Sequence, residues 1–214
     1  LRGKLKYPDG TRPDVQKESL RWFDYWLKGL DNGIASEPAV RYYVMGAAGE
    51  DAVPGNEWRT ASDWPVPARQ TYYYLHGGGM LNRDSPIASA AASEPDAESA
   101  ATSFLADPLH PAEIPGRSFP GAADAREFEK QSEVRTFTTE VLTEPVEWTG
   151  KVQAELFVSS TARDTDFIIR ISDVYPDGRS ILIMDYVRRA RYREGYDHEV
   201  PLEPGKITKV AFDI

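Results

Sequence analysis

The stretch that decides the fold reads KVQAELFVSS (151–160), TARDTD (161–166), FIIRISDV (167–174), YPDGR (175–179) and SILIMDYV (180–187). In three of these pieces apolar side chains alternate with the others, which is the period-two pattern of a strand with one buried face. Between the second and third strands, Pro176 presets the backbone at one corner and Gly178 takes the positive φ of the next. The pattern therefore predicts one hairpin unit of three strands and two turns over residues 151–192.

Outside this stretch the strand signals are short and lie between Pro and Gly residues. They predict strands at 40–45, 71–76, 134–138 and 146–149, and a last strand around Ile207, Val210 and Phe212. No helix is expected after residue 34. Many short strands joined by Pro/Gly turns are typical of an all-β sandwich.

One helix is predicted over residues 14–28, between Pro13 and Gly29. Asp14 can cap its first turn, and Gly29 suits the left-handed position after its last residue. Helical spacing gathers one broad and mostly apolar face, made of Val15, Ser19, Trp22, Phe23, Trp26, Leu27 and Leu30. A face with so many large aromatics must pack on something large. Either the β-segments of this chain cover it or a domain outside the chain does, and we favour the second.

Composition sets limits on the kind of protein. A chain of 214 residues is one domain, or one domain plus a piece of another. A net charge of −9 argues against a nucleic-acid partner, because neutralising phosphates needs clustered positive charge. Without cysteine there is neither a disulfide framework nor a thiolate metal site. No stretch approaches the ~20 apolar residues of a membrane span, so we expect no membrane partner.

The first residues, LRGK (1–4), contain neither an initiator Met nor a secretory signal. We interpret this start as a cut into a longer protein. For that reason the sequence gives no prediction of the compartment.

Residues that could carry chemistry are few. The string closest to a G-x-S-x-G nucleophile elbow is GRSFPG (116–121), but it has Pro120 in place of the second Gly and no strand-turn-helix context. Chance explains it better. His76, His110 and His198 are isolated, with no partner at zinc-site spacing. We therefore expect structural histidines, and no catalytic residue, cofactor or metal in this chain.

Two charged clusters each have a functional and a plainer interpretation. Asp164 and Asp166 could ligate calcium, or they could bond their own turn and pair with nearby arginines. The arginine run 188–193 could hold a phosphate, or it could form the salt-bridged edge of a strand with Arg189, Arg191 and Arg193 on one face. We favour the plainer interpretation of both.

Aromatic side chains could mark a carbohydrate site. The candidates are Trp58, Trp64, Tyr72 and Tyr74. Aromatic rings can stack on sugars, but in sandwiches they more often pack in the core or between domains, and we favour packing.

Several strings also resemble a known family. They are TG (149–150), LFVSS (156–160), DTDF (164–167), DVYPDGRS (173–180) and RARYR (189–193). In this order they are similar to the C-terminal domain of the cocaine esterase / X-Pro dipeptidyl-peptidase hydrolases. The string RWFDYWLKG (21–29) is similar to the helix that closes the α/β-hydrolase domain of that family. Shorter matches in the same order are WR (58–59), WP (64–65), YL (74–75), ADP (106–108) and TEVL (139–142).

The resemblance implies a fold and a division of the chain. Residues 1–34 would be the tail of an α/β-hydrolase domain, and residues 35–214 a jelly-roll (galactose-binding-like) β-sandwich that is incomplete at its C-terminal end. The family's catalytic Ser, Asp and His lie on the hydrolase domain and would all precede Leu1. The chain would then be the non-catalytic C-terminal domain of a serine hydrolase acting on esters or peptides, packed on its own hydrolase domain.

The resemblance also implies one site and one further partner. The family loop ahead of the segment that matches residues 124–126 presents an apolar aromatic to the acyl pocket, which places Phe119, beside Ser118, in the pocket wall. Alternatively, Phe119 packs in the core of its own domain. A missing strand would leave an open sheet edge, which a second copy or another polypeptide could pair with. Two other functions stay open, a carbohydrate-binding jelly-roll module and a purely structural interaction or dimerisation module.

Overall fold

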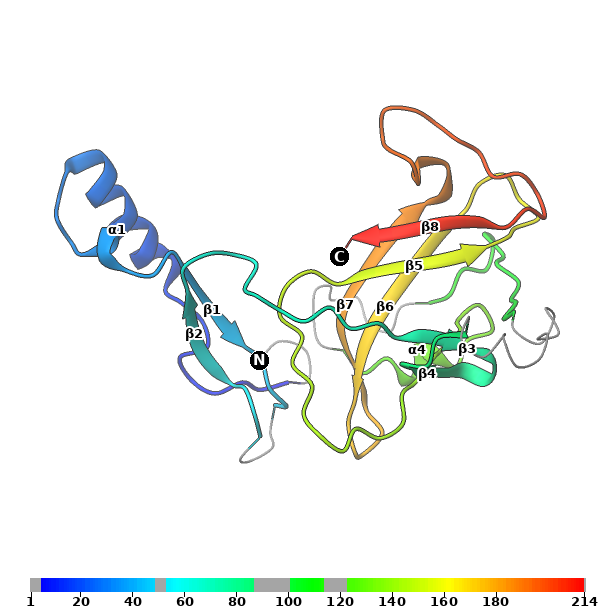
Figure 1. Ribbon diagram of the computed structural model, residues 1–214, viewed down its shortest axis with the longest axis horizontal. Helices are drawn as coiled ribbons and strands as arrows, with labels where there is room; N and C mark the ends of the chain where they lie inside the picture. The colour runs from blue at the N-terminus through cyan, green and yellow to red at the C-terminus, as the bar shows by residue number, and fades with distance from the viewer. Residues whose placement is uncertain (1–4, 49–52, 87–100, 114–122, 214) are drawn as a thin grey trace. The chain divides into compact units, whose positions relative to one another are not determined.

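The computed structural model describes residues 5–48, 53–86, 101–113 and 123–213 (Figure 1). Strands predominate and helices are few, which confirms the all-β class. The chain forms two compact units. Unit 1 comprises Leu1–Arg69 and Pro145–Gly150, and unit 2 comprises Gln70–Glu144 and Lys151–Ile214.

Unit 1 contains helix α1 (Val15–Lys28), which confirms the predicted helix. The side chain of Asp14 accepts a hydrogen bond of 3.0 Å from the Lys17 amide and so caps the first turn. Gly29 has a φ of 67°, and its N–H donates to the carbonyl of Tyr25 at 3.1 Å. A residue with a Cβ resists this left-handed conformation, which is why a glycine ends the helix.

A β-hairpin completes the regular structure of unit 1. β1 (Val40–Val44) pairs antiparallel with β2 (Glu57–Ala61). The register sets Tyr43 opposite Trp58, and the two rings meet edge to face with 5.4 Å between their centroids. Of these two strands, the sequence predicts β1 and misses β2. The string EWRTA of β2 has too few apolar residues for a period-two pattern.

The segment Pro145–Gly150 belongs to unit 1 but does not form the strand predicted at 146–149. Nη1 of Arg59 in β2 lies 2.9 Å from Oε2 of Glu147, and the Thr149 hydroxyl donates to Oε1 of the same carboxylate at 2.7 Å. Side-chain bonds rather than a backbone ladder therefore hold this segment.

Unit 2 contains two longer two-stranded sheets, coloured yellow to red in Figure 1. β5 (Gln153–Val158) pairs antiparallel with β8 (Thr208–Asp213), and β6 (Asp166–Val174) pairs antiparallel with β7 (Ser180–Arg189). The β6–β7 hairpin and the last strand confirm their predictions. The predicted three-stranded hairpin is wrong, because β5 pairs with β8 and not with β6.

The connection between β5 and β6 explains this pairing. The carbonyl of Ser160 accepts from the N–H of Gly205 at 2.9 Å, and the carbonyl of Arg163 accepts from the N–H of Leu202 at 2.7 Å. These bonds hold the connection against the loop that leads into β8, so β8 continues alongside β5. The period-two pattern marks a buried face correctly, but it does not say which strand is the neighbour.

The core of unit 2 lies where the two sheets meet. Val210 and Phe212 of β8 are 0% and 1% exposed, and they stand opposite Leu156 and Ala154 of β5. The ring of Phe212 also meets the ring of Tyr186 in β7 at 6.3 Å between centroids. β8 thus joins the two sheets through its buried face.

A smaller hairpin in unit 2 consists of β3 (Tyr74–His76) and β4 (Met80–Asn82), joined by the 3₁₀ turn η2 (Gly77–Gly79). β3 is the last half of the strand predicted at 71–76. The strand predicted at 134–138 reduces to a single bridge between Thr138 and Met80.

Helical turns do occur after residue 34, so the expectation of none is wrong. Within the described residues they are η1 (Ile34–Ser36), which begins at that residue, η2 (Gly77–Gly79), α4 (Arg126–Glu129) and η3 (Ala190–Tyr192). Each is about one turn long, which is too short for apolar residues to repeat at helical spacing. Because β7 ends at Arg189, the alternation predicted along the arginine run stops there. Among the described residues, no helix is both long and apolar enough to cross a bilayer.

Phe212→Ala should lower the free energy of unfolding of unit 2 by ~3–5 kcal/mol, because a buried aromatic leaves a cavity between the sheets. Phe157→Ala is the matched control, since Phe157 is 71% exposed on the outer face of β5, and we expect a change within ~0.5 kcal/mol. Urea unfolding followed by fluorescence measures both. Equal effects of the two substitutions would contradict this position of the core.

Candidate functional site

The polar side of α1 faces its own unit. Glu18 pairs with Arg41 of β1 at 3.7 Å, and Arg21 pairs with Glu37 at 2.5 Å. The side-chain amide of Asn32 donates to the carbonyl of Arg21 at 2.7 Å. The helix is therefore attached to unit 1 by hydrogen bonds and ion pairs, and not by its apolar face.

The opposite side of α1 is apolar and exposed. Trp26 and Leu27 are 60% and 78% exposed, and the Trp22 and Trp26 rings lie 5.7 Å apart between centroids. We call this surface the α1 apolar face, which consists of Val15, Leu20, Trp22, Phe23, Trp26, Leu27 and Leu30. Exposed apolar patches rimmed by polar residues commonly mark interaction surfaces. The described residues of unit 1 leave this face uncovered, so it is the first candidate site.

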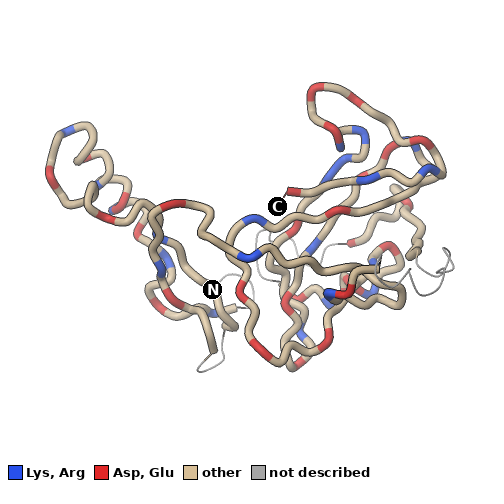
Figure 2. Tube along the Cα trace, viewed as in Figure 1, with Lys and Arg blue, Asp and Glu red and all other residues tan. Residues whose placement is uncertain are grey.

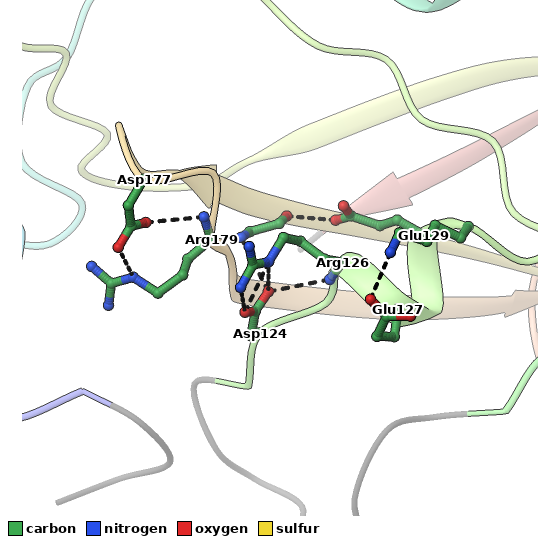
Figure 3. Close-up of polar contacts among 8 residues, drawn as sticks. Asp124, Arg126, Glu127, Glu129, Asp177 and Arg179 are labelled. Atoms are coloured by element: carbon green, nitrogen blue, oxygen red, sulfur yellow. Dashed lines mark hydrogen bonds and ion pairs between the residues drawn. The ribbon is translucent and has the colours of Figure 1, made fainter.

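The second candidate lies at the start of β7, where a short segment pairs with the strand edge (Figure 3). The N–H of Ala125 donates to the carbonyl of Ser180 at 2.7 Å, and the N–H of Leu182 donates to the carbonyl of Ala123 at 3.3 Å. Asp124 thereby forms an antiparallel bridge with Ile181. Residues 123–125 cover part of an edge that would otherwise be unpaired.

Side chains reinforce this bridge. The carboxylate of Asp124, whose side chain is 9% exposed, accepts bonds of 2.6 and 3.0 Å from Arg126 and one of 3.4 Å from the Ser180 N–H. The Arg126 guanidinium and, more weakly, the Arg126 and Ser180 amides lower the pKa of Asp124 to about 2. The Ser180 hydroxyl, on a residue 2% exposed, donates to Glu129 at 2.5 Å. We call Asp124, Arg126, Glu129 and Ser180 the Asp124 clamp.

The chemistry open to the clamp is structural. The Asp124 carboxylate is bonded to Arg126 and Ser180, and the Ser180 hydroxyl is bonded to Glu129. The hydroxyl therefore faces a carboxylate and not an imidazole that would activate it. The neighbouring pair of Asp177 and Arg179, 2.6 Å apart, stabilises the β6–β7 turn beside the clamp. Gly178 has a φ of +83°, which confirms the predicted turn.

The acidic turn before β6 is paired with arginines. Asp164 lies 3.3 Å from Arg189 and accepts a bond of 3.0 Å from the Arg191 N–H, while Asp166 lies 2.7 Å from Arg189. Elsewhere along the described trace, acidic and basic residues are also interspersed (Figure 2). The distances confirm that the acidic pair bonds to nearby arginines. Arg189, Arg191 and Arg193 are salt-bridged as expected, but the predicted strand edge with all three on one face is wrong, because β7 ends at Arg189 and the turn η3 follows. Within the described ranges no group of three His, Cys, Asp or Glu could hold a metal ion.

Each histidine bonds a neighbour close in sequence. His76 contacts the carbonyl of Asp84 at 3.0 Å, and His198 contacts Asp197 at 3.0 Å. His110 lies 2.9 Å from Asp107, and this bond, together with the Leu109 amide, lowers the pKa of that carboxyl. Their interpretation as structural residues stays a prediction.

Trp58 and Trp64 each contact one ring within unit 1 but are 38% and 49% exposed, so the packing interpretation of these aromatics stays a prediction. Trp58 lies against Tyr43, and Trp64 meets Tyr42 with 5.5 Å between ring centroids. The predicted pocket-wall residues Phe119 and Ser118 lie outside the described residues, as does the string 116–121.

Comparison with known proteins shows the family to which the chain belongs. Residues 32–214 match the family of the X-Pro dipeptidyl-peptidase C-terminal non-catalytic domain. The chain is 40% identical to the cocaine esterase of Rhodococcus sp. (strain MB1 Bresler) over 200 residues, which are 90% of this chain and 33% of that protein. The structure is similar to an aminopeptidase from the marine sediment archaeon Thaumarchaeota archaeon, with a TM-score of 0.75 at 25% identity over 100% of this chain and 35% of that one. It also resembles an α-amino acid ester hydrolase, with a TM-score of 0.68 at 25% identity over 90% of this chain and 33% of the other.

These matches define the class as the non-catalytic C-terminal domain of esterases and peptidases. The chain belongs to the X-Pro dipeptidyl-peptidase C-terminal non-catalytic domain family, and the resemblance stated from its sequence is confirmed. It spans about a third of the length of the curated relatives it matches.

Asp124→Asn should destabilise unit 2 at neutral pH and lose this effect in acid. The folded pKa of about 2 lies below the ~3.9 of an unfolded Asp, so the charged form stabilises the fold above about pH 4. That stabilisation disappears as the pH falls toward 2. Urea unfolding across this range measures the difference between variant and wild type.

Glu127→Gln serves as the control, because Glu127 of α4 is exposed and pairs with the exposed Lys130 at 2.6 Å. We expect it to change the stability little at any pH. A deficit of Asp124→Asn that stays constant down to about pH 2.5 would contradict the assigned role of the charge.

Proposed function

We propose that this chain is the non-catalytic domain of a larger serine hydrolase that acts on ester or peptide bonds, and that it packs on the hydrolase domain of the same polypeptide. The observation that carries the proposal is the α1 apolar face, which points away from the contacts that attach α1 to unit 1. In this proposal residues 1–34 are the tail of the hydrolase domain and residues 35–214 form a jelly-roll sandwich.

The size of the face supports a domain-scale partner. Burying a large apolar side chain contributes ~1.5–3 kcal/mol, so the three aromatics Trp22, Phe23 and Trp26 alone represent several kcal/mol of unused burial. The relatives that are named esterase, aminopeptidase and ester hydrolase are about three times as long as this chain, which leaves room for such a partner.

The catalytic steps belong to the hydrolase domain in this proposal. Acyl transfer by a serine enzyme needs a nucleophile, a base that takes its proton and donors for the oxyanion. In the described part of this chain the buried hydroxyl of Ser180 is bonded to Glu129 and the histidines are bonded locally. The contribution of this chain is to cover the acyl pocket, with Phe119, beside Ser118, in its wall.

Open sheet edges support a second kind of contact. β5–β8 and β6–β7 are two-stranded sheets, and a two-stranded sheet has two edges that further strands could extend. We propose that another copy of the chain, or further strands of the same polypeptide, pairs with such an edge. The residues that alternate inward on β5 and β8 would then belong to a larger sandwich.

The double variant Phe23→Ser, Trp26→Ser should abolish binding between this chain and its hydrolase domain when the two are expressed as separate polypeptides. The wild-type pair should co-purify and hydrolyse p-nitrophenyl acetate, whereas this chain alone should show no turnover above background. Lys17→Ser, an exposed polar position on the same helix, is the matched control and should bind like the wild type. The absence, ahead of Leu1 in the gene, of a G-x-S-x-G string followed by an Asp and a His would overturn the proposal.

Phe119→Ala, in the chain joined to its hydrolase domain, should change the preference among acyl groups while the melting temperature of this chain barely moves. The reason is that a pocket-wall side chain contacts substrate and not the core. Turnover of a series of p-nitrophenyl esters of increasing acyl length measures the preference. A large loss of stability with unaltered preference would show that Phe119 packs in the core of its own domain.

A further inference from the structure

We propose that Arg188 and the aromatic rings around it form a binding site for a carboxylate ligand. The site lies at the end of β7, in the arginine run 188–193 whose sequence could hold an anion. All its residues belong to unit 2, so it is independent of the proposed docking of α1. The carboxylate belongs either to a small organic acid or to an acidic side chain of a polypeptide.

Arg188 differs from the other arginines of the run in its lack of an acidic partner. Arg189 pairs with Asp166 at 2.7 Å, and Arg193 pairs with Glu194 at 3.1 Å. Among the described residues, no carboxylate lies within ion-pairing distance of the Arg188 guanidinium. In a chain with a net charge of −9, an arginine left without an acid is unusual.

The Nε atom of Arg188 is buried and makes no hydrogen bond with the described residues. The Nε atoms of Arg21, Arg170 and Arg191 share this state, but each lies 3.5 or 3.6 Å from a carboxylate oxygen. Arg188 therefore carries a partly buried positive charge that no described acid compensates. Such a charge is costly, because no ion pair offsets its desolvation. An anion bound from outside would offset that cost.

Two aromatic rings hold the guanidinium in place. The Cζ atom of Arg188 lies 5.6 Å from the centroid of the Tyr186 ring and 5.5 Å from that of the Tyr196 ring. A cation over an aromatic face is attracted to it electrostatically. Tyr186 is fixed in turn by Phe212 of the core, and Tyr196 lies 5.9 Å from Tyr192 between ring centroids. The guanidinium is thus oriented before a ligand binds, which lowers the entropic cost of binding.

The terminal nitrogens of Arg188 lie on the exposed side of the site. Nη1 donates to the hydroxyl of Tyr196 at 3.3 Å, and Tyr196 is 71% exposed. Of the Arg188 nitrogens, Nε is the one that is buried without a bond, so Nη2 stays accessible. A carboxylate that approaches from this side can accept hydrogen bonds from the guanidinium and from the Tyr196 hydroxyl together.

The balance of charge favours a carboxylate over a phosphate. The other arginines of the run already share the acids Asp164, Asp166, Glu194 and Glu199, so they have no charge to spare for a ligand. Glu199 also lies near the rings, because it accepts a bond of 2.7 Å from the Tyr192 hydroxyl. One uncompensated guanidinium matches the single charge of a carboxylate, whereas a dianionic phosphate would be repelled more strongly by these acids.

Acetate is the probe for a direct test on the full chain. Titration with sodium acetate, against sodium chloride at equal ionic strength, should shift the Nε–Hε signal of Arg188 in nitrogen-15 NMR spectra. We expect the shift to saturate with a Kd on the order of 10 mM, as for a few charge-assisted hydrogen bonds. Inorganic phosphate at pH 8 should bind more weakly than acetate.

Variants assign the binding to Arg188, with the backbone amides of residues 192–196 as the readout. Arg188→Gln should weaken acetate binding about tenfold or more, because it removes the charge and the paired donors. Arg188→Lys keeps the charge but not the planar fork, and should bind less tightly than the wild type. Arg163→Gln, an exposed arginine of the same unit, is the matched control and should bind like the wild type. The amide signal of the buried Val210 reports whether each variant is folded.

A second probe, a glutamate blocked by acetyl and amide groups, distinguishes the two sources of the carboxylate. Tighter binding of the blocked glutamate than of acetate supports an acidic side chain of a polypeptide, and tighter binding of acetate supports a small organic acid. An Arg188 signal that does not shift saturably up to about 100 mM acetate overturns the site. Equal affinity in wild type and a folded Arg188 variant, or tighter binding of phosphate than of acetate, overturns it as well.

Discussion

The packing of Phe212 between the two sheets of unit 2 is the contact on which the rest of that unit depends. The β5–β8 and β6–β7 sheets share no ladder, so side chains must hold them together. Phe212 does so because it stands opposite Ala154 on one strand and meets the Tyr186 ring on another. Since β5 and β8 are far apart in sequence, the pairing forms only after a long loop has closed, and buried apolar area must offset that entropy.

Local interactions made part of this fold predictable. The cap at Asp14 and the left-handed Gly29 lie within a few residues of the groups they bond, so the helix could be placed at both ends from sequence. The β6–β7 turn was predictable for the same reason. The partner of β5 was not, because alternation specifies a buried face and leaves the neighbouring strand open. α4 and η3 were missed because one helical turn is too short to show a period.

The candidate sites also divide into those that the sequence predicted and one that it did not. The pairing of Asp164 and Asp166 with the arginine run was predictable because the β6–β7 hairpin sets the start of β6 opposite the end of β7. The α1 apolar face was visible in the spacing of its residues, and the structure left it exposed. The Asp124 clamp could not be found this way, because Asp124 and Ser180 are joined only when the β7 edge receives a segment from far away in the chain. A buried serine beside a distant acid leaves no pattern in a single sequence.

The attachment of α1 has an energetic consequence for the proposed docking. A helix of 14 residues is marginal in isolation. Its exposed ion pairs contribute ~0–1 kcal/mol each and its cap about 1 kcal/mol. The α1 apolar face, by contrast, offers several side chains worth ~1.5–3 kcal/mol apiece on burial, which together approach the ~5–15 kcal/mol that stabilises a whole domain. Most of the stability available to α1 therefore lies on the side that faces away from its own unit. Ordering of this helix and docking of a partner must then be coupled, so that α1 is most stable where the proposed partner is bound.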